Sequence, residues 1–395
     1  MSSPDEWQRQ EHIRIATEAA RKGRWARRGR RAWGLLRSRP GQLISVGVVG
    51  ALIGGLLTAW QTDSLPWSDE NETVCWGTLP EKDAEALFRS ELSVRAEEIR
   101  PDYGSDSSPD AQGACRLVAL RDGSPVAHID FRLHQLDGRY DPQATGWLAD
   151  FLSPLAVPFG KGFVGMTSEN RTWVALPSGC SDGGLSDGPA VVDASWGRLP
   201  MNSRDKPRWR DQVARATVRL ANGAMRALDC DGALPIPGTL PATPRQKNTE
   251  PRRLCGVDGL ALAPLSKDER YQLEDTLLTH SPGTARVCGV GLGAAATRAR
   301  LRLVTIEDPR LAQVLADLGA AFGRREFDKR GGSSAGPGLA LYQTSCQTGL
   351  VVFLIQDEGT RMDDLPRKLL PRYAAAEAER LGCGPVKVEL PRQGS

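Results

Sequence analysis

An uncharged apolar run from Leu43 to Trp60 restricts the fold of this chain more than any other stretch. A helix that crosses the hydrocarbon core of a bilayer needs about 20 mainly apolar residues. The run comes close to that length, so we predict a transmembrane helix over residues 41–61. The alternatives are a buried helix of a soluble protein and a cleavable signal peptide. The lack of charge argues against the buried helix, and the sequence has neither the short leader nor the small-residue cleavage site of a signal peptide.

Charges on the two sides of the apolar run predict its direction. Residues 1–40 contain eleven Arg or Lys. The residues that follow the run are acidic: Asp63, Asp69, Glu70 and Glu72. Basic flanks stay in the cytoplasm, so we expect residues 1–40 to form a basic cytoplasmic arm. The chain beyond a juxtamembrane linker, residues 62–74, should then be extracytoplasmic, and the expected location is the cell membrane with a single span.

The arm and the span each suggest a partner. Arginine clusters beside a membrane attract anionic lipid, at about 1 kcal/mol per charge near the surface. The arm contains no recognisable nucleic-acid-binding module, so we expect lipid and no nucleic acid as its partner. In the span, Gly50 and Gly54 form a GxxxG pair. Such a pair lets two helices approach closely and would permit a homodimer through the transmembrane helix.

The cysteines predict an oxidising environment for the outer region. All eight follow the apolar run: Cys75, Cys115, Cys180, Cys230, Cys255, Cys288, Cys346 and Cys383. An even number confined to the outer side indicates disulfides. No CxxC pair is present, and no histidine lies at metal-ligand spacing from two cysteines, so we expect no metal site. Nothing in the sequence points to a cofactor.

An internal repeat indicates how the outer region is organised. Asp141–Asp150 reads DPQATGWLAD and Asp308–Asp317 reads DPRLAQVLAD, with Asp-Pro and Leu-Ala-Asp at the same separation. Hairpin-like, apolar and helical segments and four cysteines surround each stretch in the same order, which is typical of a duplicated unit. We predict a first copy over residues 75–238, a linker over 239–252 and a second copy over 253–392.

The duplication favours one pattern of disulfides. Each copy has four cysteines, and the order of segments favours pairing the first with the second and the third with the fourth. The predicted bridges are Cys75–Cys115, Cys180–Cys230, Cys255–Cys288 and Cys346–Cys383. Each loop is long enough for its bridge to contribute about 3–4 kcal/mol in the chain-entropy model.

The predicted fold class is α+β, with one N-terminal transmembrane helix followed by two tandem related domains. Each domain is expected to be a small, mainly antiparallel sheet with two or three helices on one face and two disulfides. In AHIDFRL, Ala127, Ile129, Phe131 and Leu133 alternate with polar residues, as in a strand with one wet face. Residues 212–229 place their apolar side chains on one stripe, which indicates a helix.

No stretch carries a convincing catalytic constellation, and we predict no catalytic residue. Ser334 lies in a GxSxG pattern, which needs a strand before it and a helix after it; here the pattern indicates a flexible loop. Asp150 and Asp317 recur in the two copies and could point to a groove, but exposed helix positions are the default interpretation. The Asp of each Asp-Pro is a natural helix N-cap. His128 and His134 share one face of a strand and are interpreted as surface histidines.

In composition and architecture the chain resembles single-pass, disulfide-bearing, membrane-anchored proteins of high-GC actinobacteria. The resemblance rests on arginine over lysine, abundant Ala and Gly, a basic arm, a span and a cystine-bearing exterior, and it implies no functional residue. We expect a non-enzymatic, extracytoplasmic binding or interaction module at the cell envelope, with a protein or envelope component as partner. The alternatives are an extracytoplasmic hydrolase that uses Ser334 or a carboxylate pair, and a signalling subunit that acts through its cytoplasmic arm.

Overall fold

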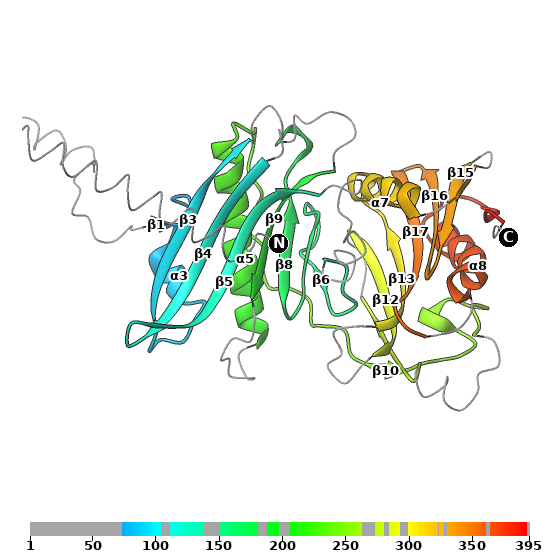
Figure 1. Ribbon diagram of the computed structural model, residues 1–395, viewed down its shortest axis with the longest axis horizontal. Helices are drawn as coiled ribbons and strands as arrows, with labels where there is room; N and C mark the ends of the chain where they lie inside the picture. Colours follow the sequence, from blue (N-terminus) through cyan, green and yellow to red (C-terminus); the bar gives the residue numbers. More distant parts are fainter. Residues whose placement is uncertain are drawn as a thin grey trace, which may run out of the picture. The chain divides into compact units, whose positions relative to one another are not determined.

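Figure 1 shows the chain as a computed structural model. The structure describes residues 73–103, 111–136, 151–180, 188–196, 206–262, 273–279, 284–292, 299–322, 324–327, 330–360 and 364–392. The basic arm, the predicted span over residues 41–61 and its pair Gly50 and Gly54 lie outside these residues. Among the residues that are described, no helix is both long enough and apolar enough to cross a bilayer.

A seven-stranded antiparallel sheet forms the first half of the described chain. Its strand order is β3-β4-β5-β9-β8-β7-β6. The bounds are β3 (Ser93–Tyr103), β4 (Ala111–Arg121), β5 (Ser124–Gln135), β6 (Val157–Pro158), β7 (Gly165–Thr167), β8 (Arg171–Ala175) and β9 (Ala190–Trp196). Smaller elements complete this half: the ribbon of β1 (Thr73–Val74) and β2 (Leu79–Pro80), then α3 (Glu81–Glu85) and the 3-10 turn η1 (Ser178–Cys180).

An eight-stranded antiparallel sheet forms the second half. Its order is β10-β11-β12-β13-β17-β16-β15-β14. The bounds are β10 (Lys247–Asn248), β11 (Asp275–Leu278), β12 (Ala285–Leu292), β13 (Ala299–Ile306), β14 (Arg324–Phe327), β15 (Gly331–Gly336), β16 (Leu339–Cys346) and β17 (Gly349–Asp357). The 3-10 turn η3 (Leu254–Gly256) lies between β10 and β11 in the chain.

The two sheets have corresponding strand orders. Apart from the short edge strand β10, the series β11 to β17 occupies the same order in its sheet as β3 to β9 does in the other. A long helix follows the last strand of each series, α5 (Lys206–Ala227) after β9 and α8 (Leu365–Arg380) after β17. In each half of the chain, a long helix and then a C-terminal tail therefore follow the last strand of the series.

Alternating side chains decide which helix covers which face. Ile129, Phe131 and Leu133 of β5 pack with α5, while their polar neighbours face the other way, so the predicted one-sided strand is confirmed. In the second sheet, Phe353 of β17 packs with α8 and Leu354 packs with α7 (Pro309–Phe322). The helices α7 and α8 therefore cover opposite faces of that sheet, as Figure 1 shows.

One apolar core joins the two sheets. It contains Trp173 and Val191 from the first sheet together with Val304 and Leu354 from the second, and α7 contributes Leu315. All five side chains are almost completely buried. Residues 72–395 accordingly form one compact unit.

Two polar contacts accompany this shared core. The backbone N–H of Gly165 in β7 donates to the hydroxyl of Thr284 at 3.0 Å. The guanidinium of Arg310 in α7 donates to the carbonyl of Leu176 at 2.7 Å. Both contacts join the first half of the described chain to the second, so the two sheets share polar as well as apolar interactions.

The described chain contains four disulfides, at the predicted pairs. They are Cys75–Cys115, Cys180–Cys230, Cys255–Cys288 and Cys346–Cys383. The bridges that involve Cys230 and Cys383 lie directly after α5 and α8. Cys346 is the last residue of β16, and Cys180 lies in the turn η1 after β8, so each bridge fixes the chain just after a long helix to a strand or to the turn that follows one.

The predicted fold class is wrong. The described residues are mainly β, in two large sheets and a ribbon, where two small sheets with two or three helices each on one face were expected. Strand β11 illustrates the reason: it ends a segment rich in charged residues, 266–278, and it pairs with both β10 and β12. Pairing with neighbouring strands overrides local helix propensity. The boundaries of the two copies stay a prediction.

Two local predictions about helices are confirmed. Most of the stripe predicted over residues 212–229 belongs to α5, which begins earlier, at Lys206, and ends at Ala227. Asp308 caps α7, because its Oδ1 accepts hydrogen bonds from the backbone N–H groups of Arg310 at 3.1 Å and Leu311 at 3.2 Å. Pro309 occupies the first position of this helix, where a missing N–H costs nothing.

Candidate functional site

A pocket of about 350 Å³ lies at the start of α5. The β7–β8 hairpin and the tail that follows α5 complete its wall. The lining residues are Ser168, Glu169, Pro207, Trp209, Arg210, Leu240, Ala242 and Thr243. The volume falls in the range of sites that enclose a small organic molecule.

Hydrogen bonds hold the tail against α5. The carboxylate of Asp211 accepts from the backbone N–H of Leu240 at 3.3 Å. The Nη2 of Arg210 donates to the carbonyl of Pro241 at 2.6 Å. Two neighbouring side chains of one helix therefore fix two neighbouring residues of the tail, and this places Leu240 in the pocket wall.

Trp209 forms the aromatic side of the pocket, and a second tryptophan, Trp196, packs against it. The indole Nε1 of Trp209 donates to the carbonyl of Leu87 at 2.7 Å, which orients the ring. Trp196 packs edge-on against Trp209, with ring centroids 4.7 Å apart. The Nε1 of Trp196 donates in turn to the carbonyl of Glu169 at 2.9 Å. The hairpin that carries Glu169 is thus fixed to the same wall as Trp209.

Arg210 is the unusual residue of the pocket. Only 7% of its surface is exposed, and its Nε has no hydrogen-bond partner in the part of the chain that is described. Among the described residues, no carboxylate forms an ion pair with it. Burial lowers the pKa of the Arg210 guanidinium below its ordinary value, and the charge of Asp211 only partly opposes that effect. A buried cation without a paired anion is costly. A negatively charged group bound beside Arg210 would therefore be stabilised.

The corresponding arginine in the second half of the chain is compensated. Arg367 lies near the start of α8 and donates to the carbonyl of Pro391, in a Leu-Pro step that matches Leu240–Pro241. In contrast to Arg210, its Nε lies 3.2 Å from Oδ2 of Asp364, within an ion pair. The helix–tail contact is therefore common to both halves, and the buried cation without an ion pair is specific to Arg210.

A second polar cluster lies on the face of the first sheet opposite α5. The carboxylate of Asp193 is almost completely buried, accepts from Arg171 and lies 3.0 Å from Nε2 of His134. The guanidinium of Arg171 also stands over the ring of Phe151, 4.8 Å from its centroid. Arg171 and His134 both contact the carboxylate of Asp193, so we interpret the cluster as structural. The predicted surface position of His134 is only partly correct, since its side chain also contacts Asp193 of β9, the neighbouring strand in the sheet.

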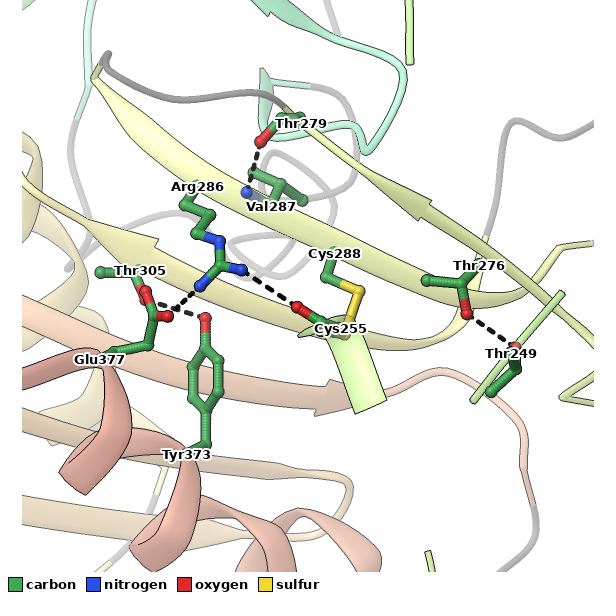
Figure 2. Close-up of a disulfide and its surroundings, with 10 residues drawn as sticks. All are labelled: Thr249, Cys255, Thr276, Thr279, Arg286, Val287, Cys288, Thr305, Tyr373 and Glu377. Atoms are coloured by element: carbon green, nitrogen blue, oxygen red, sulfur yellow. Dashed lines mark hydrogen bonds and ion pairs between the residues drawn. A yellow bond between two sulfur atoms is a disulfide. The ribbon is translucent and has the colours of Figure 1, made fainter. Parts of the chain in front are cut away.

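Figure 2 shows a third cluster, around the buried carboxylate of Glu377 in α8. Arg286 of β12 forms an ion pair with it, and the hydroxyl of Thr305 donates to it at 2.9 Å. Arg380 donates to the same carboxylate at 2.9 Å. Tyr373 lies 2.8 Å from the Thr305 hydroxyl. These groups satisfy one another and leave no vacant position for a ligand, so the cluster fixes α8 to the sheet.

Two residues considered for a hydrolase site, Ser334 and Asp317, lie on separate elements of the second half. Ser334 lies within β15, paired with Leu341 of β16, and only 4% of it is exposed, so the prediction of a flexible loop is wrong. Asp317 lies in α7 and accepts from Gln313 at 3.1 Å. Asp150 is outside the described residues. Within the parts of the chain that are described, no group of three potential metal ligands occurs.

The sequence does not predict the pocket at Arg210, for a physical reason. Arg210 stands in an amphipathic helix among other arginines, where a charged residue is ordinarily solvent-exposed. The only local signal is the pair of Leu-Pro steps, which follow the last cysteine of each half. Comparisons with protein-family models, with curated proteins and with solved structures give no match.

Proposed function

We propose that this chain is an extracytoplasmic binding protein that holds a small organic carboxylate in the pocket at the start of α5. The observation that carries the proposal is Arg210, a residue that is more than nine-tenths buried and has no paired carboxylate among the described residues. A bound carboxylate would supply the missing negative charge through charge-assisted hydrogen bonds.

The remainder of the wall suits an apolar group. Trp209, Leu240 and Pro207 present mostly carbon to the pocket, and Thr243 adds a hydroxyl. Sites for small molecules commonly combine apolar walls with a few polar groups that fix orientation. The proposed ligand is therefore a carboxylate that carries an aliphatic or aromatic group.

The disulfides support the proposed location. Four bridges occur in the described chain, with no free cysteine among those residues. Disulfides of this kind persist in oxidising compartments. The proposal places the folded region outside the cytoplasm, with the basic arm inside and near anionic lipid. The two alternative functions receive no such support, because Ser334 is buried and residues 1–40 lie outside the described residues.

Calorimetry with phenylpropionate tests the proposal on the full-length chain. We expect binding by the unmodified protein and by Arg367→Gln, and at least tenfold weaker binding by Arg210→Gln. Arg367→Gln is the matched control because it removes the same helix–tail contact at the corresponding position. The neutral amide of the same probe should bind weakly to all three proteins. Equal affinity of the Arg210→Gln variant for phenylpropionate would contradict the proposal.

A further inference from the structure

We infer that the ligand of this pocket is a zwitterion, with an ammonium group beside Glu169, a carboxylate beside Arg210 and an apolar side chain against Trp209. Its chemical class is an apolar α-amino acid or a short peptide of such residues. The inference rests on the proposed function, because it assigns the carboxylate to Arg210 and adds a second polar position.

Glu169 supplies the negative charge of the pocket. It lies at the tip of the β7–β8 hairpin and lines the same pocket as Arg210. Among the described residues no cation forms an ion pair with its carboxylate. The wall of the pocket thus contains one cation and one anion that do not neutralise each other directly.

The position of Glu169 is fixed by its backbone. The backbone N–H of Ser168 donates to the carbonyl of Arg171 at 2.7 Å, which closes a two-residue turn. Within that turn the carbonyl of Glu169 accepts from Trp196, whose ring contacts Trp209. These hydrogen bonds hold the backbone of Glu169 in place. A ligand therefore need not order this turn before it binds.

The charge pattern excludes simpler ligands. A dicarboxylate would place its second negative group near Glu169, where like charges repel. An amine without a carboxylate would leave Arg210 uncompensated. A group that carries both charges satisfies both side chains, and this is the arrangement of an amino acid.

Size and shape agree with this class. A volume of about 350 Å³ accommodates one large amino acid or a small peptide. Trp209 is 8% exposed and Leu240 is 6% exposed, so each presents a small, defined surface. An aromatic or branched side chain would gain from contact with both.

Calorimetry on the full-length chain with four probes tests the inference: L-phenylalanine, phenylpropionate, phenylethylamine and L-leucyl-L-phenylalanine. We expect L-phenylalanine to bind at least tenfold more tightly than phenylpropionate or phenylethylamine. In Glu169→Gln, the advantage over phenylpropionate should vanish. Glu250→Gln, which removes an exposed carboxylate outside this pocket, should keep it. Tighter binding of the dipeptide than of phenylalanine would identify peptides as the source of the ligand, and weaker binding would identify free amino acids.

The outcomes separate the inference from the function on which it rests. If phenylpropionate binds as tightly as phenylalanine and loses affinity in Arg210→Gln, the zwitterion is refuted and the carboxylate site stands. If none of the four probes binds, both are refuted. Glu169 is exposed, so its replacement should leave the fold intact, and the unfolding midpoint of the variant checks this.

Discussion

Buried charges in this protein are of two kinds. Glu377 is 1% exposed. Its carboxylate forms ion pairs with Arg286 and Arg380 and accepts a hydrogen bond from Thr305. Arg210 is nearly as buried and has a backbone carbonyl as its partner. A buried charge that is paired and hydrogen-bonded can be accommodated in a stable fold, whereas a buried charge without an ionic partner is costly. The contrast is the basis for the proposed binding site at Arg210, whereas the contacts of Glu377 are those of a stabilising cluster.

Replacement of Glu377 by Gln should be strongly destabilising. The change keeps the shape of the side chain but leaves Arg286 facing a neutral group in a buried site. Breaking a buried pair in this way costs about 3 kcal/mol or more. Urea unfolding measures the loss. Glu389→Gln is the control, since the pair of Glu389 with Lys387 is exposed and its removal should leave the midpoint unchanged. Similar midpoints for the two variants would contradict this interpretation.

Tyr373 should make stability depend on alkaline pH. Burial is the main cause that raises the pKa of its phenol above the ordinary value, and the charge of Glu377 adds to the effect. In the unfolded chain the phenol of Tyr373 loses its proton at about pH 10, as a free tyrosine does. In the folded chain the same phenol keeps its proton at that pH. The unfolded state then binds fewer protons, so the free energy of unfolding falls as pH rises above about 10, by at most about 1.4 kcal/mol per pH unit.

The matched variant for this prediction is Tyr373→Phe. It removes the titrating group and keeps the ring in its buried position. Urea unfolding between about pH 8 and about pH 11 should give a shallower decline for the variant than for the unmodified chain. Parallel declines would show that Tyr373 does not contribute to the pH dependence.

At the scale of elements, the N-terminus of α7 offers a clear test. Asp308 accepts two backbone N–H groups of the first turn of the helix. Substituting Ala for an N-cap carboxylate costs about 1 kcal/mol. Thermal or urea unfolding of Asp308→Ala should show that loss, while Gln313→Ala, on the exposed side of the same helix, should change stability by less than about 0.5 kcal/mol. An equal effect of both changes would rule out a specific cap.

The same elements show what the sequence could predict. Asp308–Pro309 identified the start of α7, because an Asp side chain and a Pro at the next position meet the needs of a helix terminus locally. The disulfide pairs were predictable because the duplication of segment order restricted pairing to each half. The strand β15 was missed, because GGSSAG contains no β-branched or aromatic residue. Its strand conformation comes from pairing with β14 and β16 on its two sides.

The candidate site was less predictable than the fold. Its wall combines a hairpin, a helix and a tail that lie far apart in the chain, and Glu169 meets Trp196 only because β9 pairs with β8. No local pattern reports that an arginine will be buried without an anion. A site of this kind is defined by tertiary contacts, so it becomes visible only in the structure.

At the scale of the whole molecule, the shared core should couple the two halves. Leu315 of α7 is completely buried among side chains from both sheets. Every one of the ten tryptophans lies at or before Trp209, so tryptophan fluorescence reports on the first half only. The pairing of Arg310 with the carbonyl of Leu176 adds a polar link between the halves. Unfolding of the second half should therefore change the fluorescence of the tryptophans in the first half.

Leu315→Ala tests this coupling, because the changed residue and the fluorescent reporters lie in different halves of the chain. Removing a buried leucine side chain costs about 2–5 kcal/mol. We expect the urea midpoints measured by tryptophan fluorescence and by far-ultraviolet circular dichroism to fall together, by the same amount. Leu370→Ala, in the core between α8 and its sheet, should do the same if the whole region unfolds as one unit. A fluorescence midpoint that stays constant while the dichroism midpoint falls would show two halves that unfold independently, and the shared core would then contribute little to stability.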